Sequence, residues 1–168
     1  MRFTRHGFRE MLIGSLALAI VGTGLGLAWW PLALVVVPLL IWLFAFFRDP
    51  ERDIPADQHA MVSPADGTIS DIEQLPNHEL LGGPCVRIGI FLSVFNVHVN
   101  RAPCDGKVID LRYKRGKFIN AMSHNAASDQ NESNTMVLAD PTTGRPIAVV
   151  KQIVGLIARR IVCSKEVG

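Results

Sequence analysis

The chain has 168 residues, with 17 lysines and arginines against 15 aspartates and glutamates, which gives a formal net charge of +2. This near balance excludes a protein that binds nucleic acid through a strongly basic surface. Hydrophobic residues make up 49% of the chain, and they are concentrated near its N-terminus.

The first predicted element is a pair of apolar helices. No charged residue occurs between Met11 and Phe47. As a single helix this stretch would be about 55 Å long, whereas the hydrocarbon core of a bilayer is about 30 Å thick. Glycines followed by Trp-Trp-Pro divide it into Met11–Trp29 and Pro31–Phe47. We therefore expect residues 1–47 to form a membrane-anchoring hairpin that either spans the bilayer twice or re-enters it.

Basic residues flank this apolar stretch on both sides: Arg2, Arg5, Arg9, Arg48 and Arg52. Positive charge marks the cytoplasmic ends of membrane segments, so the following domain is expected on the cytoplasmic side of the cell membrane. A cleaved signal peptide fits less well, because the apolar stretch is too long and no small-residue cleavage site follows it.

Residues 48–60 are polar, contain two prolines and are predicted to be a linker. Beyond them, short apolar runs alternate with turn residues, which is typical of strands. The predicted strands are Thr68–Ile72, Val86–Leu92, Phe95–Asn100, Gly106–Tyr113, Thr135–Ala139, Ile147–Ile153 and Ala158–Cys163, with one weak helix within Asn120–Asn131. The expected fold class is therefore β-rich α+β: a membrane helical hairpin followed by one compact, mostly antiparallel β domain over residues 61–168.

The cysteine and histidine patterns indicate neither a disulfide framework nor a metal site. Cys85, Cys104 and Cys163 lie far apart, and an odd number of cysteines on the expected cytoplasmic side indicates reduced thiols. The histidines of the β domain show no metal-ligand spacing.

Two Pro-x-Asp-Gly sequences, at 64–67 and 103–106, each precede a predicted strand. Proline fixes a turn dihedral, aspartate bonds local amides and glycine tolerates positive φ, so both are predicted to be turns. Asp105 is expected to do no more than this. Asp66 is also a candidate catalytic carboxylate, provided that its turn lies beside a general base.

Residues 95–100 alternate between apolar and polar side chains, which predicts a strand with Asn96, His98 and Asn100 on one face. By pattern alone, such a histidine is more often solvated or structurally bonded. Histidine also transfers protons most readily near neutral pH, and the two asparagines could orient the imidazole or a substrate. His98 is therefore the candidate general acid or base.

A basic stretch over Arg112–Phe118 is next. Its ordinary interpretation is a solvated charge run. Its functional interpretation is a surface that binds anionic lipid headgroups. Each basic residue near an anionic membrane contributes about 1 kcal/mol to such binding. The polar stretch Asn120–Asn134 is predicted to be a surface loop or a lid over a site.

Taken together, the motifs resemble those of the phosphatidylserine decarboxylases, specifically their compact bacterial and archaeal class. The resemblance lies in the order and spacing of SPADG (63–67), FLSVFNVHVNRAPCDG (91–106), RGKFINA (115–121), NESN (131–134) and KQIVGLIARRIVC (151–163). It implies an enzyme of phospholipid biosynthesis that removes CO₂ from phosphatidylserine to give phosphatidylethanolamine. It also implies a proenzyme that cuts itself at a Gly-Ser bond, so that the serine becomes a pyruvoyl group heading a small α chain and forms a Schiff base with the substrate amine.

By the same resemblance, Asp66 stands where the family has the acid of self-cleavage, and His98 where it has an active-site histidine. The residues that would line or flank the lipid headgroup are Asn96, Asn100, Lys114, Arg115, Lys117 and Phe118. No external cofactor and no nucleic acid are implied. The expected partners are phosphatidylserine, an anionic membrane surface and the α chain, with a homodimer left open.

Three features depart from the family pattern. Longer members have a second histidine where this chain has Arg101, and a guanidinium cannot exchange protons near neutral pH, so His98 would serve cleavage as well as decarboxylation. Ser133 replaces an arginine in a motif that often reads NERN. No serine follows a glycine in the last fifty residues. The pyruvoyl-forming serine and a C-terminal strand are therefore expected to be missing, through truncation rather than through processing to a β chain.

The competing interpretation is a non-catalytic, membrane-anchored module that is lipid-binding or biotinyl/lipoyl-like, because similar turns open strands in biotinyl- and lipoyl-type domains. A carrier of that type presents a lysine on an exposed hairpin, usually between two methionines, and no Met-Lys-Met sequence occurs here. A decarboxylase-derived lipid-binding protein would differ from the enzyme only in lacking the serine.

Overall fold

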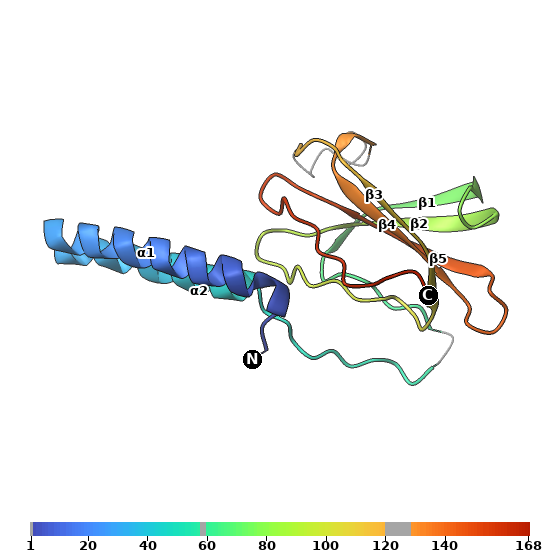
Figure 1. Cartoon of the computed structure of the whole chain (residues 1–168), viewed down its shortest axis with the longest axis horizontal. Helices are drawn as coiled ribbons and strands as arrows, with labels where there is room; N and C mark the ends of the chain where they lie inside the picture. The colour runs from blue at the N-terminus through green and yellow to red at the C-terminus, as the bar shows by residue number, and fades with distance from the viewer. Residues whose placement is uncertain (1, 58–59, 120–128) are drawn as a thin grey trace. The chain divides into compact units, whose positions relative to one another are not determined.

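A computed structural model describes residues 2–57, 60–119 and 129–168 (Figure 1). The chain forms two units. The helical unit consists of Met1–Asp53 and Leu92–Asn100, and the sheet unit consists of Ile54–Phe91 and Arg101–Gly168. The chain therefore leaves the sheet unit after Phe91, contributes nine residues to the helical unit and returns at Arg101.

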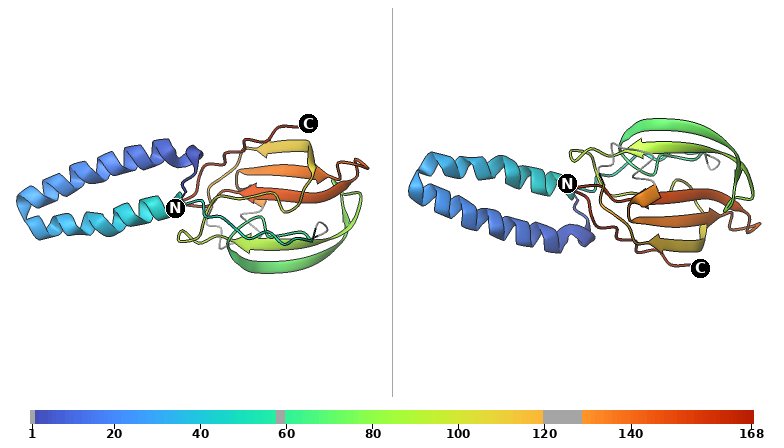
Figure 2. Two further views of the ribbon diagram at one scale, coloured as in Figure 1. Left: turned by 90° about the horizontal axis from the view of Figure 1, so that it is seen from below. Right: turned by 90° about the horizontal axis from the view of Figure 1, so that it is seen from above.

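Two helices run side by side in the helical unit, as both views in Figure 2 show. A short 3-10 turn η1 (Arg5–Gly7) leads into α1 (Phe8–Ala28), and a second 3-10 segment η2 (Trp30–Val35) leads into α2 (Val36–Phe46). Trp29 has an extended backbone that ends α1, and Pro31 lies in the first turn of η2. The predicted break at Trp-Trp-Pro is thus confirmed.

Glycines bring the two helices close together. A Cβ atom on Gly14 would lie 2.8 Å from the side chain of Leu43 on the facing helix. The large apolar side chains Leu12, Ile13, Leu16 and Ile20 are each more than half exposed. By length and composition Arg5–Ala28 is able to cross a membrane, whereas the apolar helix Trp30–Phe46 is shorter.

The sheet unit contains two antiparallel sheets. The strands β1 (Thr68–His78) and β2 (Gly83–Phe91) form a hairpin; β3 (Lys107–Lys114), β4 (Ser133–Ala139) and β5 (Pro146–Ile153) form a second sheet in the order β3-β4-β5. The central strand β4 is the most buried, and its Val137, Leu138 and Ala139 form the core with Val108 and Val154. The predicted β-rich α+β fold with antiparallel strands is confirmed.

Strand β1 is longer than predicted and continues to His78. The sequence did not predict this continuation, because it contains polar residues and Pro76, and proline has no backbone N–H to donate a hydrogen bond to a neighbouring strand. Here the β1–β2 register is interrupted between Leu75 and His78, so Pro76 lies where the ladder does not require its amide.

Two predicted strands are wrong. Phe95–Asn100 is irregular, although its polar and apolar residues alternate. Ala158–Cys163 is also irregular, and it follows a turn in which the Gly155 amide donates to the Ala158 carbonyl (3.0 Å). Alternation describes the side chains only, whereas a strand also needs a partner for its backbone. The weak helix predicted within Asn120–Asn131 lies mostly outside the described residues.

Candidate active site

The 92–100 segment (Leu92–Asn100) lies against the end of α2 within the helical unit. Three side chains donate hydrogen bonds to its carbonyl groups: Trp42 Nε1 to Val94 O (3.2 Å), Arg48 Nη2 to Phe95 O (2.9 Å) and Arg52 Nη2 to Val99 O (3.2 Å). These side-chain donors take the place of the neighbouring strand that the sequence pattern predicted.

Asn96 closes a turn at the start of this segment. Its backbone amide donates to Ser93 O (2.9 Å), and its Oδ1 accepts from Ser93 N (2.8 Å). The side-chain oxygen Oδ1 of Asn96, a predicted headgroup ligand, therefore has a structural role. Contact of Asn96 or Asn100 with a headgroup stays a prediction.

The His98 imidazole is fixed by two contacts. Its ring stacks on Phe46 at the end of α2, with 4.2 Å between ring centroids and 23° between planes. Its Nδ1 lies 3.1 Å from Asn96 O. A carbonyl oxygen can only accept, so Nδ1 carries the proton, and the neutral ring has its lone pair on Nε2.

The surroundings of His98 favour this neutral form. Burial lowers the pKa of His98 below its ordinary value of 6.5, and the positive charge of Arg48 acts in the same direction. The hydrogen bond to Asn96 O opposes both effects in part. At neutral pH, Nε2 is therefore able to accept a proton, as a general base must.

Asp66 lies in the sheet unit, half-buried in the bend that precedes β1. The two Pro-x-Asp-Gly bends are adjacent, because Val62 N donates to Pro103 O (2.8 Å) and Arg101 N donates to Pro64 O (2.9 Å). The chain bends at both predicted positions, but neither Gly67 nor Gly106 adopts a positive φ. Asp66 and His98 belong to different units, and their cooperation stays a prediction.

The basic stretch is fastened to the residues that precede β4. Lys114 Nζ donates to Asp129 O (2.7 Å), and Lys117 Nζ donates to Gln130 Oε1 (3.0 Å). The Arg159 guanidinium lies over the Phe118 ring, with its Cζ atom 5.6 Å from the ring centroid. The stretch is thus partly structural, and Arg115 is exposed.

Asn131 has a structural role that the sequence did not reveal. Its side chain is completely buried; Oδ1 accepts from Ile119 N (2.9 Å), and Nδ2 donates to Ile119 O (2.8 Å) and Val154 O (2.9 Å). One amide group thus joins the end of the basic stretch to the residue after β5.

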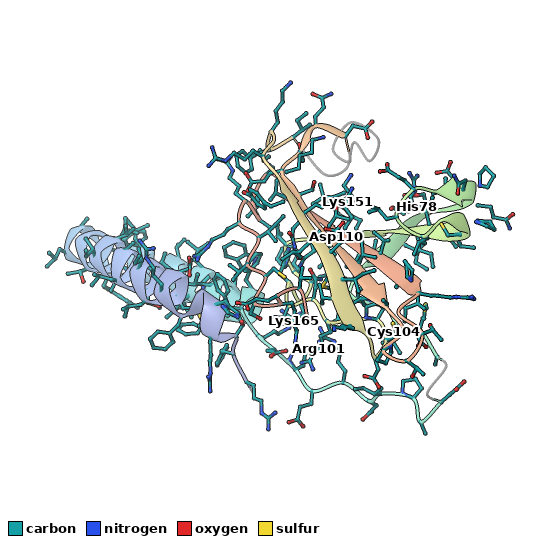
Figure 3. All side chains as sticks on the ribbon, turned by 45° about the vertical axis from the view of Figure 1, so that its right-hand side comes forward. His78, Arg101, Cys104, Asp110, Lys151 and Lys165 are labelled. Carbon is teal, nitrogen blue, oxygen red and sulfur yellow. The ribbon has the colours of Figure 1, made fainter. Side chains whose placement is uncertain are left out.

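Lys151 is a basic residue of the three-stranded sheet. In β5 it shares a sheet face with Arg112 and Lys114, as the strand register shows, and Figure 3 labels it on this sheet. Burial lowers the pKa of Lys151, and the charges of Lys114 and Arg87 lower it further, against the opposing effect of Asp129. On this face the Arg112 guanidinium is paired with Asp110 (2.7 Å).

Comparison with known proteins decides the family. The phosphatidylserine decarboxylase family model matches residues 39–168. The phosphatidylserine decarboxylase proenzyme of Rhodopirellula baltica is 41% identical over 99% of this chain, and those of Ruegeria pomeroyi and Cereibacter sphaeroides are 48% and 49% identical over 84% of it. This chain belongs to the phosphatidylserine decarboxylase family. It covers 68%, 65% and 61% of the lengths of these three relatives.

The predicted family is therefore confirmed, and the match to the decarboxylase model includes every candidate site residue. It begins within α2, so it also includes Trp42 and Phe46 of α2 and Arg48 just beyond it, which contact the 92–100 segment. Sequence reasoning assigned Trp42 and Phe46 to the membrane anchor and Arg48 to the linker, and it missed their contacts with the segment that holds the candidate histidine.

Proposed function

We propose that this chain takes part in the decarboxylation of phosphatidylserine to phosphatidylethanolamine, as a membrane-anchored component of phospholipid biosynthesis. The observation that carries the proposal is the state of His98. In a chain of the phosphatidylserine decarboxylase family, a stacked, partly buried imidazole presents Nε2 as a proton acceptor.

The family resemblance implies a pyruvoyl group, which would supply an electron sink for the charge left when CO₂ departs. The donor set around His98 fits a site of this kind. Its Nδ1 is committed to Asn96 O, which leaves Nε2 for a reacting atom, and the pKa of the imidazole is lowered. His98 is the residue that we assign to serve this group, with Asp66 for its formation.

Decarboxylation replaces a carboxylate on the headgroup carbon with one proton. In the proposed mechanism, His98 takes up a proton at Nε2 and delivers it to that carbon. A lowered pKa suits this step, because the protonated imidazole gives up its proton readily. Arg101 offers no second imidazole, so His98 is also proposed to act as the base in self-cleavage, with Asp66 as the acid.

The hairpin supports the proposed membrane attachment. Its large apolar side chains face outward, a surface that hydrocarbon accommodates and water does not. With arginines at both ends of the apolar stretch, we propose that the domain lies on the cytoplasmic side. The headgroup would meet Asn96, Asn100 and the basic stretch, in which Arg115 is exposed.

The test is CO₂ release from phosphatidylserine labelled with ¹⁴C in its carboxyl group. Membranes would carry the protein expressed from its complete gene, with or without His98→Ala. Loss of a general acid–base group lowers the rate about 10²- to 10⁴-fold, and this is the expected result. His78→Ala is the matched control, because His78 lies in the β1–β2 hairpin and its Nδ1 accepts from the Leu80 amide (3.3 Å).

Equal release from the wild type and His98→Ala would contradict the assigned role of His98. Binding of phosphatidylserine vesicles without any CO₂ release from the wild type would favour the alternative, a lipid-binding module without catalysis.

A further inference from the structure

The end of α2 contacts the segment that contains His98. Phe46 and Trp42 of α2, and Arg48 just beyond the helix, contact the 92–100 segment through one ring contact and two hydrogen bonds. We propose that Phe46, Arg48 and Trp42 are positioning residues for His98, so that the membrane anchor itself sets the direction of Nε2. This inference rests on the proposed function of His98.

Two restraints define the orientation of a planar ring: the plane in which it lies and its rotation within that plane. Phe46 sets the plane through the stacked contact, and the Nδ1 bond to Asn96 O sets the rotation. The Phe46 ring in turn makes a tilted contact with Trp42 and an edge contact with Phe47. The ring centroids are 5.8 Å and 5.1 Å apart, respectively. The direction of Nε2 therefore depends on a side chain of the anchor.

Arg48 and Trp42 fix the backbone that supplies the second restraint. Arg48 Nη1 donates to Ala45 O in the last turn of α2 (2.6 Å), and Nη2 donates to Phe95 O (2.9 Å). The guanidinium thus bridges the helix end to the residue before Asn96, while Trp42 holds Val94 O. A lysine at position 48 has one nitrogen and cannot reproduce this planar two-point bridge.

The charges around the ring act with this geometry. Arg48 is the cation whose charge lowers the pKa of His98, and Arg52 donates to Val99 O from the chain that follows α2. The 92–100 segment has no titratable residue other than His98. Removing the charge of Arg48 or the cover of Phe46 is therefore expected to raise the pKa of His98.

The experiment is NMR of the full chain in nanodiscs that contain phosphatidylserine. ¹⁵N-labelled histidine reports both the tautomer and the pKa of each imidazole, and His98→Gln assigns the His98 signals. The wild type should show the Nδ1–H tautomer with a pKa below 6.5. Phe46→Leu should give a mixture of tautomers and raise that pKa, and Arg48→Gln should raise it as well.

Phe46→Tyr keeps the ring and should restore wild-type signals, which separates stacking from general packing. Phe44→Leu is the matched control on the same helix, because Phe44 contacts Phe3 (5.8 Å), and it should leave His98 unchanged. In turnover assays of the protein expressed from its complete gene, Phe46→Leu should lower kcat about 10²-fold, as expected for a misplaced catalytic group, with little change in KM.

Wild-type His98 signals in both Phe46→Leu and Arg48→Gln would overturn the inference, even if His98→Ala were inactive. Altered signals together with normal turnover by His98→Ala would leave the positioning contacts in place and refute the proposed function instead. The two failures are therefore distinguishable.

Discussion

Replacing Asn131 by alanine should destabilise the sheet unit strongly. The substitution removes three hydrogen bonds: those with Ile119 N and Ile119 O are partly buried, and the one with Val154 O is buried. A buried group left unsatisfied costs about 1–3 kcal/mol. With partial relaxation at the three groups, we expect a loss of about 3–5 kcal/mol in the free energy of unfolding.

Urea unfolding in mild detergent, followed by the circular dichroism of the sheets, measures this loss. With a slope of about 2 kcal/mol per molar urea, the midpoint should fall by about 2 M. Asn77→Ala is the control, because Asn77 is exposed in the β1–β2 hairpin, and it should shift the free energy by less than about 0.5 kcal/mol. If Asn131→Ala moved the midpoint no more than this control, the three bonds would not stabilise the sheet unit.

Three further predictions concern single groups. Because burial lowers the pKa of His98, the unfolded chain binds the proton more tightly than the folded chain. The free energy of unfolding should therefore fall as pH falls below about 6.5 toward the folded pKa, and His98→Gln should flatten that part of the pH profile. Gly67→Ala would push a Cβ into a backbone carbonyl of β2 and should lower the free energy of unfolding by about 1–3 kcal/mol. The control Gly83→Ala should be tolerated, because its Cβ would meet no atom within 4 Å. Equal urea midpoints for the two variants would contradict this prediction. Lys114→Gln should raise the pKa of Lys151, because the charge of Lys114 lowers it, and NMR of the ¹³C-methylated lysine would refute this by showing no change.

The sequence predicted the sheets better than the histidine segment for a physical reason. Strand β1 pairs with β2, and β4 pairs with β5, each across a short connection, so that side-chain periodicity and backbone pairing agree. In the 92–100 segment they disagree. The donors for its carbonyl groups come from Trp42, Arg48 and Arg52, and no local pattern links residues that lie so far apart in the chain.

The candidate site was only partly predictable. His98 and Asp66 stand out through their motifs, but the residues that orient His98 do not. Phe46 belongs to an apolar run in which an aromatic residue is expected for membrane reasons alone. Its contact with His98 depends on the return of the chain to the helical unit after Phe91, which alternation predicted as an ordinary strand.

The structure also explains one departure from the family pattern. Ser133, which stands where the motif often has arginine, is 2% exposed at the start of β4. A guanidinium at this position would need to leave the core or find paired charges within it, because burying an unpaired charge is costly. The serine is therefore compatible with a structural role for the NESN motif, alongside that of Asn131.

The most direct test of the central claim is decarboxylation in D₂O. The protein expressed from its complete gene would be supplied with phosphatidylserine in membranes, and the headgroup of the product would be analysed by mass spectrometry. The account predicts phosphatidylethanolamine with one deuterium on the carbon that lost CO₂, formed at least about 10²-fold more slowly by His98→Ala. Absence of phosphatidylethanolamine, or the same deuterated product at the same rate from His98→Ala, would contradict it.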